Sequence, residues 1–323
     1  MAAISAAGRQ RNTEAFKNMP QLRHLVRTAA QATFETPSAF ASISRGFRRW
    51  SIVNAENSVH QEFNICELDP GGSIDTHVHT FEKSIYVLEG ELVCETGDGA
   101  FALKEGDYGV MLVAAPHAFR NVSSTRTRWA EMLAPQPRLG SKGDAFGVSP
   151  LAHAVPPQPV DPRNPQTRFF GNITPQHMEA NKQTQDLLSV SASMRTALLV
   201  YSGITVKMMV DSQLGAVLST MFMVQYEPEG LAGSHDHPFE ETYLILEGEV
   251  DAWFDGVMYR LKPGDVAWAG VGSVHGFRNP LNKIVRWLET SAPQPPARYS
   301  YRFARDWTAL ESNQQKQDEV NKK

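Results

Sequence analysis

Short runs of β-branched and aromatic residues, closed by turn residues, recur in two regions of the chain. Residues 84–88 (SIYVL) and 242–246 (TYLIL) are two such runs, and a Glu-Gly pair follows each of them. This pattern is typical of strands bounded by turns. Asp255-Gly256 is a hairpin signal, and Pro263-Gly264-Asp265 predicts a turn that opens another strand. Helical periodicity is almost absent, so we expect an all-β protein built from closed antiparallel barrels or jelly rolls.

The second region repeats the first at a single offset of 158 residues, without a gap. The residues that coincide include His77 with His235, His79 with His237, His117 with His275, Phe119-Arg120-Asn121 with Phe277-Arg278-Asn279, and Arg128-Trp129 with Arg286-Trp287. Such a register is typical of a duplicated domain. We therefore expect two barrels in tandem.

The predicted divisions of the chain are an N-terminal arm (1–45), a first domain (46–140), a Pro-rich linker (141–165), a second domain (166–305) and a polar tail (306–323). A short helix near Gln176–Leu188 has only a weak pattern.

Composition narrows the class of protein. The 323 residues suffice for two domains with buried cores, and 31 basic against 35 acidic residues do not suit a nucleic-acid binder. Cys66 and Cys94 are too few for a disulfide framework, so we interpret both as buried thiols. No run approaches the roughly 20 apolar residues of a membrane span. We expect a cytoplasmic homo-oligomer that binds a small-molecule substrate, with no nucleic-acid or membrane partner.

The first 34 residues contain five basic residues and a single acidic one, Glu14. Two interpretations remain open for this segment. It is an arm that packs on the body through the apolar stripe Leu22, Leu25 and Val26, or it is an organelle transit peptide, which has a similar charge pattern.

Candidate metal ligands cluster in the second copy. His235, His237 and Glu241 are all odd-numbered, so in an extended strand their side chains would share one face. His275 follows on a later strand, with Gly272 before it to give the backbone room. Three neutral imidazoles and a carboxylate suit one divalent first-row metal ion with an open position. Fe or Mn is favoured, and Ni or Zn also fits.

The first copy keeps the three histidines but not the carboxylate. His77, His79 and His117 remain, whereas Lys83 stands at the position that matches Glu241, and Glu82 lies on the opposite face of the strand. Either this copy has lost its metal and serves as a scaffold or an anion site through Lys83, or it holds iron by three histidines alone. We prefer the first alternative because an ammonium ion opposes the charge of a metal ion.

These motifs resemble those of the cupin superfamily. The segment GLAGSHDHPFEETYLILEG is similar to the first cupin motif, and residues 264–279 are similar to the second. Gly230 is one residue late for the first motif, and Gly270 replaces the proline of the second. The resemblance covers roughly residues 60 to 140 and 218 to 300. It implies two jelly-roll (double-stranded β-helix) barrels, with a metal ion held in the second by His235, His237, Glu241 and His275.

Cupin motifs say little about the reaction, because the superfamily supports many. In layout the chain resembles quercetin-type dioxygenases, which are bicupins with a three-His-one-Glu ligand set. It also resembles (S)-ureidoglycine aminohydrolase, whose manganese lies in the C-terminal half. We expect a metal-dependent dioxygenase that acts on a small chelating enolic or aromatic substrate. The alternatives are a Mn-dependent aminohydrolase or another non-oxidative hydrolase, decarboxylase or isomerase, and a binding protein without catalysis.

Several further side chains are candidates for the pocket. Glu241 is both a ligand and a candidate catalytic base, a role that a raised pKa would favour. Phe239 and Tyr243 share the face of Glu241, and Phe277 shares the face of His275. Arg278 is either an anchor for an anionic substrate or part of a structural ion pair. The pattern leaves undetermined which way the remaining candidates point: Met221 and Met223, Phe222 and Val224, and Trp268.

Overall fold

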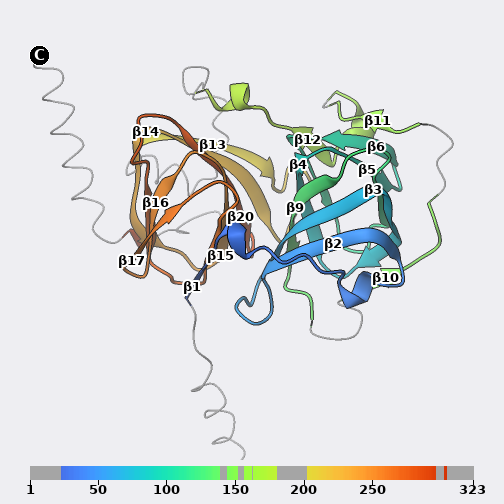
Figure 1. Ribbon diagram of the computed structural model, residues 1–323, viewed down its shortest axis with the longest axis horizontal. Helices are drawn as coiled ribbons and strands as arrows, with labels where there is room; N and C mark the ends of the chain where they lie inside the picture. The colour runs from blue at the N-terminus through green and yellow to red at the C-terminus, as the bar shows by residue number, and fades with distance from the viewer. Residues whose placement is uncertain are drawn as a thin grey trace, which may run out of the picture.

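Two curled β-sheets lie side by side in the computed structural model, which describes residues 23–138, 144–151, 156–161, 163–179, 202–295 and 302–303 (Figure 1). The described part of the chain contains no α-helix. Its helical turns are the 3-10 segments η1 (Ala29–Gln31), η2 (Ser38–Phe40), η3 (Pro165–Thr167) and η4 (Pro175–Met178). None of the described helices is long and apolar enough to cross a membrane. The expectation of an all-β protein with two barrels is confirmed.

The first sheet has 11 strands, in the order β11-β6-β5-β8-β3-β9-β4-β7-β12, and β2 and β10 also pair with β3. Its long central strand is β3, which runs from Glu62 to His79. The other strands are β2 (Ser44–Val53), β4 (Glu82–Glu89), β5 (Glu91–Thr96), β6 (Gly99–Lys104), β7 (Asp107–Met111), β8 (His117–Arg120), β9 (Thr127–Ala134), β10 (Ala145–Gly147), β11 (Gln158–Pro159) and β12 (Phe170–Asn172).

The second sheet has 10 strands, in the order β1-β18-β15-β20-β14-β19-β16-β17, and β13 and β21 also pair with β14. Its long central strand is β14, which runs from Thr220 to Asp236. The other strands are β1 (His24–Arg27), β13 (Ser202–Val210), β15 (Glu240–Glu247), β16 (Val250–Phe254), β17 (Val257–Leu261), β18 (Val266–Ala269), β19 (His275–Arg278), β20 (Val285–Ala292) and β21 (Arg302–Phe303). The hairpin at Asp255-Gly256 joins β16 to β17, as its sequence indicates.

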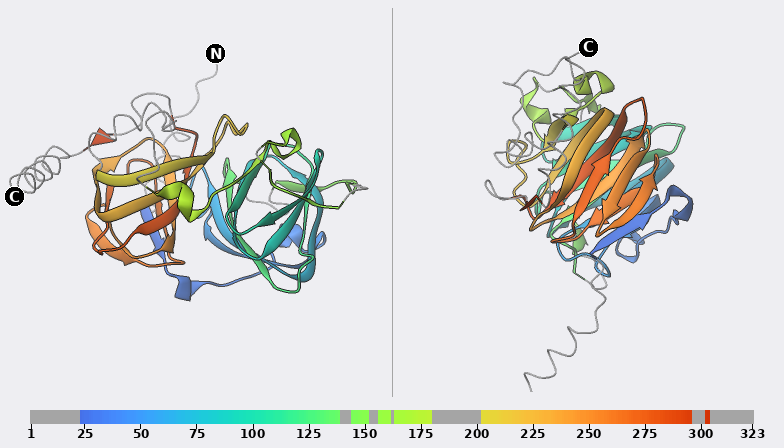
Figure 2. Two further views of the ribbon diagram at one scale, coloured as in Figure 1. Left: turned by 90° about the horizontal axis from the view of Figure 1, so that it is seen from above. Right: turned by 90° about the vertical axis from the view of Figure 1, so that its left-hand side faces the viewer.

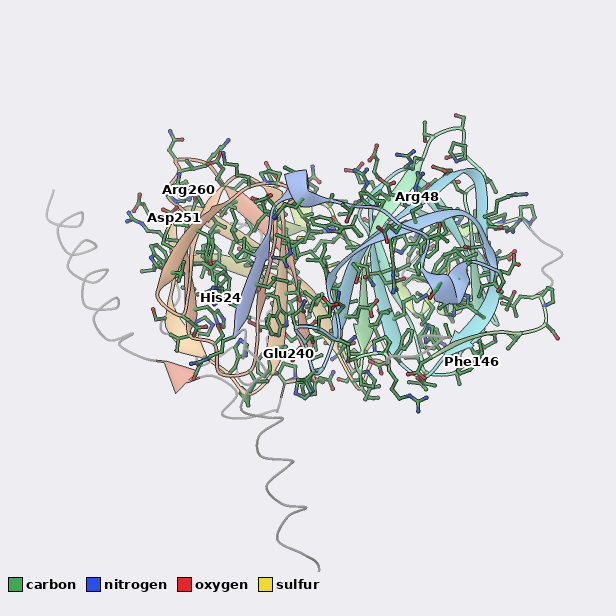
Figure 3. All side chains as sticks on the ribbon, turned by 60° about the horizontal axis from the view of Figure 1, so that its bottom comes forward. His24, Arg48, Phe146, Glu240, Asp251 and Arg260 are labelled. Atoms are coloured by element: carbon green, nitrogen blue, oxygen red, sulfur yellow. The ribbon has the colours of Figure 1, made fainter. Side chains whose placement is uncertain are left out.

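The two barrels exchange edge strands, which changes the predicted division of the chain. Strand β1, in the N-terminal arm, pairs with β18 of the second sheet, and β12 pairs with β7 of the first (Figure 2). His24 of β1 lies on the second barrel (Figure 3) and contacts Asp255 and Tyr259 through its two ring nitrogens. Strands β10 and β11, inside the predicted linker, also pair with the first sheet. The segments predicted to be the linker and the start of the second domain therefore contain strands of the first barrel.

Some predicted segments lie outside the described residues. They are Leu22 of the apolar stripe, most of the helix expected near Gln176–Leu188, and the polar tail. Leu25 is buried, and Val26 packs against the core of the second barrel. Cys66 and Cys94 are fully buried thiols, as expected.

Alternating side chains divide each main strand between two cores. One face fills its own barrel, and the other joins an apolar cluster that both barrels share. In β14, Phe222 and Val224 point into the second barrel, whereas Met221 and Met223 lie in the shared cluster. Trp268 also belongs to the shared cluster, so it is not part of the barrel interior.

Two buried carboxylates, one from each barrel, cap loops of the opposite barrel. Glu240 of β15 accepts hydrogen bonds from the backbone N–H groups of Val59 (2.9 Å) and His60 (3.3 Å) and from the hydroxyl of Ser58. Figure 3 shows Glu240 where the two barrels meet. Its counterpart 158 residues earlier is Glu82 of β4. The two contacts are therefore related by the internal repeat.

Glu82 makes the reciprocal contact. It accepts hydrogen bonds from the backbone N–H groups of Val217 (2.7 Å) and Leu218 (3.0 Å) and from the Ser219 hydroxyl (3.2 Å). Glu82 thus points away from the interior of its own barrel, as its even number indicates. Together the two carboxylates accept hydrogen bonds from part-buried backbone N–H groups that the apolar cluster could not satisfy.

Removing either carboxylate charge should therefore loosen the contact between the barrels. We expect Glu82→Gln and Glu240→Gln each to lower the free energy of unfolding by about 2 kcal/mol, because a hydrogen bond to a buried charged group contributes roughly that much. Urea unfolding followed by circular dichroism measures the change. The exposed Glu105→Gln is the matched control, and a loss no larger than in this control would contradict the assignment.

Candidate metal centre

The predicted ligands of the second copy converge inside its barrel. His235 lies near the end of β14, His237 lies in the connection that follows, and Glu241 lies near the start of β15. These residues do not share one unbroken strand, as their odd numbers were taken to indicate, because β14 ends at Asp236 before β15 begins at Glu240. His275 opens β19, and it stands opposite His235 in the pairing of β14 with β19.

The three imidazoles are oriented by the backbone. The Nδ1 atoms lie at hydrogen-bond distance from carbonyl oxygens: His235 from Gly233 (2.8 Å), His237 from Phe239 (2.7 Å) and His275 from Ser273 (2.9 Å). A carbonyl oxygen can only accept, so each Nδ1 carries a proton and each Nε2 faces the cluster, where it would bind a metal ion in place of a proton. One ligand atom from each ring lies within 4.8 Å of the others. This histidine triad could hold a metal ion.

Glu241 completes the cluster. Its Oε2 atom lies 2.8 Å from Nε2 of His237 and 3.6 Å from Nε2 of His275, and it accepts a hydrogen bond of 2.6 Å from the Tyr243 hydroxyl. The Ser291 hydroxyl donates to Oε1 at 3.2 Å. Tyr243 also lies 3.0 Å from Nε2 of His275, so its phenol joins the carboxylate to the triad.

The electrostatics of the site suit cation binding. Burial and the neighbouring imidazoles of His275 and His237 hold the pKa of His235 well below its usual value, so this ring stays neutral. Burial alone would raise the pKa of Glu241, but the charge and hydrogen bonds of His237 and His275 outweigh it and lower that pKa. The raised pKa that would have favoured Glu241 as a catalytic base is therefore not found. An ionised carboxylate is a better metal ligand and a weaker proton acceptor than that expectation implied.

Aromatic side chains form the wall around this cluster. Phe239 stacks on His237, with ring centroids 4.0 Å apart and the planes 4° from parallel. Phe277 and Tyr243 line a cavity of about 40 Å³ that also contacts His235 and Glu241. This interior cavity has room for a few water-sized groups. The three aromatic candidates thus lie at the site, as the sequence suggested.

Arg278 does not reach the site. Its side chain is exposed, and its guanidinium donates a hydrogen bond of 2.9 Å to Glu229. The matching Arg120 pairs with Glu95 in the same way. Because residues alternate along β19, His275 and Phe277 point inward while Arg278 points outward. The proposed role of Arg278 as a substrate anchor is corrected to that of a surface ion pair.

The first barrel has a similar histidine cage with a cation beside it. The ring centroids of His77, His79 and His117 are separated by 4.1, 4.7 and 6.0 Å, against 4.4, 4.9 and 6.1 Å in the second barrel. Lys83, which is 1% exposed, places its Nζ atom 3.3 Å from Nε2 of His77 and 3.5 Å from a carboxylate oxygen of Glu131. The ammonium ion points into the cage, so it is not drawn out of the barrel.

Each cage has two ionisable side chains beside it at matching positions, and the charge of this pair differs between the two barrels. Lys83 and Glu131 match Glu241 and Glu289 at the offset of 158 residues. In the first barrel the pair is an ammonium and a carboxylate, which neutralise each other. In the second barrel both are carboxyl groups, and burial together with the charge of Glu241 raises the pKa of Glu289 well above its usual value. The second cage therefore favours an added cation, whereas the first already contains one.

Comparison with known proteins agrees with this architecture. The Cupin domain family matches residues 64–133 and 222–291, two ranges with the same 158-residue offset. The protein carries two cupin domains in tandem. Quercetin 2,3-dioxygenase of Bacillus subtilis (strain 168) is 25% identical over 229 residues, which are 64% of this chain and 66%, just under two thirds, of that relative.

Solved structures show the same bicupin fold at low identity. Oxalate decarboxylase of Lactobacillus farciminis is 16% identical with a TM-score of 0.56, and the match covers 92% of this chain and 93% of that one. Oxalate decarboxylase of Bacillus subtilis is 13% identical with a TM-score of 0.57, covering 95% and 86%. These likenesses establish the fold of the bicupin and leave its reaction to be argued from the site.

The charges at positions 83 and 241 should decide metal content. We expect the metal-stripped protein, reloaded with Mn²⁺ or Fe²⁺ and desalted, to retain one ion per chain, as measured by inductively coupled plasma mass spectrometry. Lys83→Glu should gain a second ion, because it gives the first cage the carboxyl pair of the second. Glu241→Lys should retain none. The exposed Lys104→Glu is the control for added negative charge. Two ions in the unaltered protein, or no gain in Lys83→Glu, would contradict this assignment.

Proposed function

We propose that the protein is a metal-dependent dioxygenase whose reaction takes place in the second barrel, on a small enolic or aromatic substrate that chelates the metal. The convergence of a ligand atom from each of the three histidines with the carboxylate of Glu241 supports this proposal most directly. The likeness to quercetin 2,3-dioxygenase supports it independently.

His235, His237, His275 and Glu241 would hold the ion, with Fe or Mn as the favoured metals. When bound there, the ion supplies a Lewis acid for a chelating substrate and, in the case of Fe, redox chemistry with O₂. The donor set fits this role because the backbone carbonyls fix the tautomer of each imidazole, and because Glu241 enters the site as an anion.

The side chains around the ligands would orient the substrate and handle its proton. The Tyr243 hydroxyl, which donates to Glu241, can turn between that carboxylate and His275 as the charge at the site changes. Glu241 remains the candidate acceptor for a substrate hydroxyl proton. Phe239 and Phe277 provide apolar walls, which exclude water from the reacting group and strengthen electrostatic interactions there.

A non-oxidative reaction is the second candidate. The interior cavity of about 40 Å³ admits only a small reacting group, which suits a decarboxylase or hydrolase of small acids or amides as well. The Mn-dependent aminohydrolase of the ureidoglycine type belongs to this class. Oxygen consumption separates it from the dioxygenase.

An oxygen-electrode assay of the Fe-loaded protein tests the proposal. We expect oxygen uptake with a panel of flavonols, catechols and cyclic enols, and no product under anaerobic conditions. Glu241→Gln should lower kcat/KM by about 10²-fold or more, as expected when a ligand and general base is lost. The exposed Glu229→Gln is the matched control. Product formed without oxygen uptake would contradict the dioxygenase and favour the second candidate.

A further inference from the structure

A large cavity ends on Lys83 at the mouth of the first barrel. It has a volume of about 680 Å³, within the range of small-molecule sites. Lys83 and Glu131 line it together with apolar side chains, Phe40, Phe81 and Leu133. The segment that contains η2 forms one wall, and the end of β9 forms another. A small molecule that enters this cavity would therefore meet an amine beside a carboxylate.

Proton acceptors lie beside the amine of Lys83, as they do beside nucleophilic amines in enzymes. Its Nζ atom lies 3.3 Å from Nε2 of His77 and 3.5 Å from Oε2 of Glu131, so two proton acceptors are within reach. Glu131 is positioned in turn by the side-chain amide of Asn64, which donates to Oε1 at 3.4 Å. A nucleophile, an adjacent base and a group that orients the base form the arrangement typical of covalent catalysis.

Aromatic rings shield the amine from water. Nζ lies 5.7 Å from the ring centroid of Phe40 and 5.5 Å from that of Phe119. Lys83 is 1% exposed, and a lysine is almost never fully buried unless it is paired, as Lys83 is with Glu131. Lysines that react with carbonyl compounds are found in apolar pockets of this kind, shielded from bulk water.

The acceptors beside Lys83 differ in strength. Burial and the charge of Lys83 lower the pKa of His77 to about 3, so its imidazole holds a proton poorly. Glu131 is the better candidate to receive a proton from the amine and return it later. In the cage beside them, Nε2 of His79 and of His117 lacks a partner among the described residues.

We propose that Lys83 forms a Schiff base with a small aldehyde or ketone that enters through the mouth of the first barrel. The amine passes one proton to Glu131 and attacks the carbonyl carbon. A C–N bond forms as the π bond of the carbonyl group breaks, and the oxygen takes a second proton from the nitrogen to become a hydroxyl group. Glu131 returns the proton as this hydroxyl leaves as water. In sum, an ammonium ion and a carbonyl compound give a protonated imine and one water, so charge is conserved and no oxidant is needed.

The protonated imine keeps the positive charge that faces Glu131, so the ion pair of the resting barrel persists in the adduct. This site needs no metal ion and does not depend on the reaction proposed for the second barrel. The two barrels would then carry different reactive groups at matching positions, an amine in the first and a metal-binding carboxylate in the second.

Reductive trapping in the metal-stripped protein tests the proposal. Propanal and pyruvate serve as probes, sodium cyanoborohydride reduces any imine to a stable amine, and peptide mass spectrometry gives the labelling rate of each lysine. We expect Lys83 to be labelled about tenfold or more faster than the exposed Lys104 in the same sample, because an adjacent acid–base group assists imine formation. Slower labelling of Lys83 than of Lys104 would overturn the proposal, since burial without a site only hinders modification.

Two variants sharpen the result. Glu131→Gln should slow labelling at Lys83 about tenfold or more and leave Lys104 unchanged. Glu241→Gln, which alters only the second barrel, should leave labelling at both lysines unchanged, so this proposal and the proposed function fail separately. Equal labelling of Lys83 in Glu131→Gln and the unaltered protein would remove Glu131 from the mechanism as written. The comparison of Lys83 with Lys104 needs no variant, so it holds even if a variant fails to fold.

Discussion

The alternation of side chains along β4 and β15 connects the contact between the barrels to the sites within them. In β15, Glu240 points to the opposite barrel and caps its loop, and the next residue, Glu241, points into the histidine cluster. In β4, Glu82 and Lys83 divide in the same way. Because a slip of one residue would exchange the two faces, the buried capping carboxylates also hold the register that places the site residues.

Charge, more than shape, distinguishes the two cages. Their imidazoles have nearly the same spacing, and in both barrels backbone carbonyl oxygens accept hydrogen bonds from the Nδ1 atoms. The residues differ at one pair of positions, where Lys83 in the first barrel replaces Glu241 of the second, so that an ammonium beside a carboxylate replaces two carboxyl groups. A duplicated scaffold thereby carries two different arrangements of charge. One cage supplies its own cation, and the other favours a divalent one.

Much of this arrangement could be predicted from the sequence because it is local or repeated. The ungapped repeat indicated two barrels, and the histidines, Glu241 and Lys83 were found from their matching positions. The exchange of β1 and β12 between the barrels could not be found, since strand pairing over such distances leaves no local pattern. The capping role of Glu240 depends on loops of the other barrel. The lowered pKa of Glu241 and the outward direction of Arg278 depend on neighbours that only the fold brings together.

The central claim is that a divalent metal ion binds the second cage and is kept from the first by Lys83. Anomalous X-ray diffraction from crystals of the Mn- or Fe-loaded protein, recorded on both sides of the metal absorption edge, tests it most directly. The account predicts one anomalous peak per chain, among His235, His237, His275 and Glu241. A peak of similar height among His77, His79 and His117, or no peak in the second barrel, would contradict it.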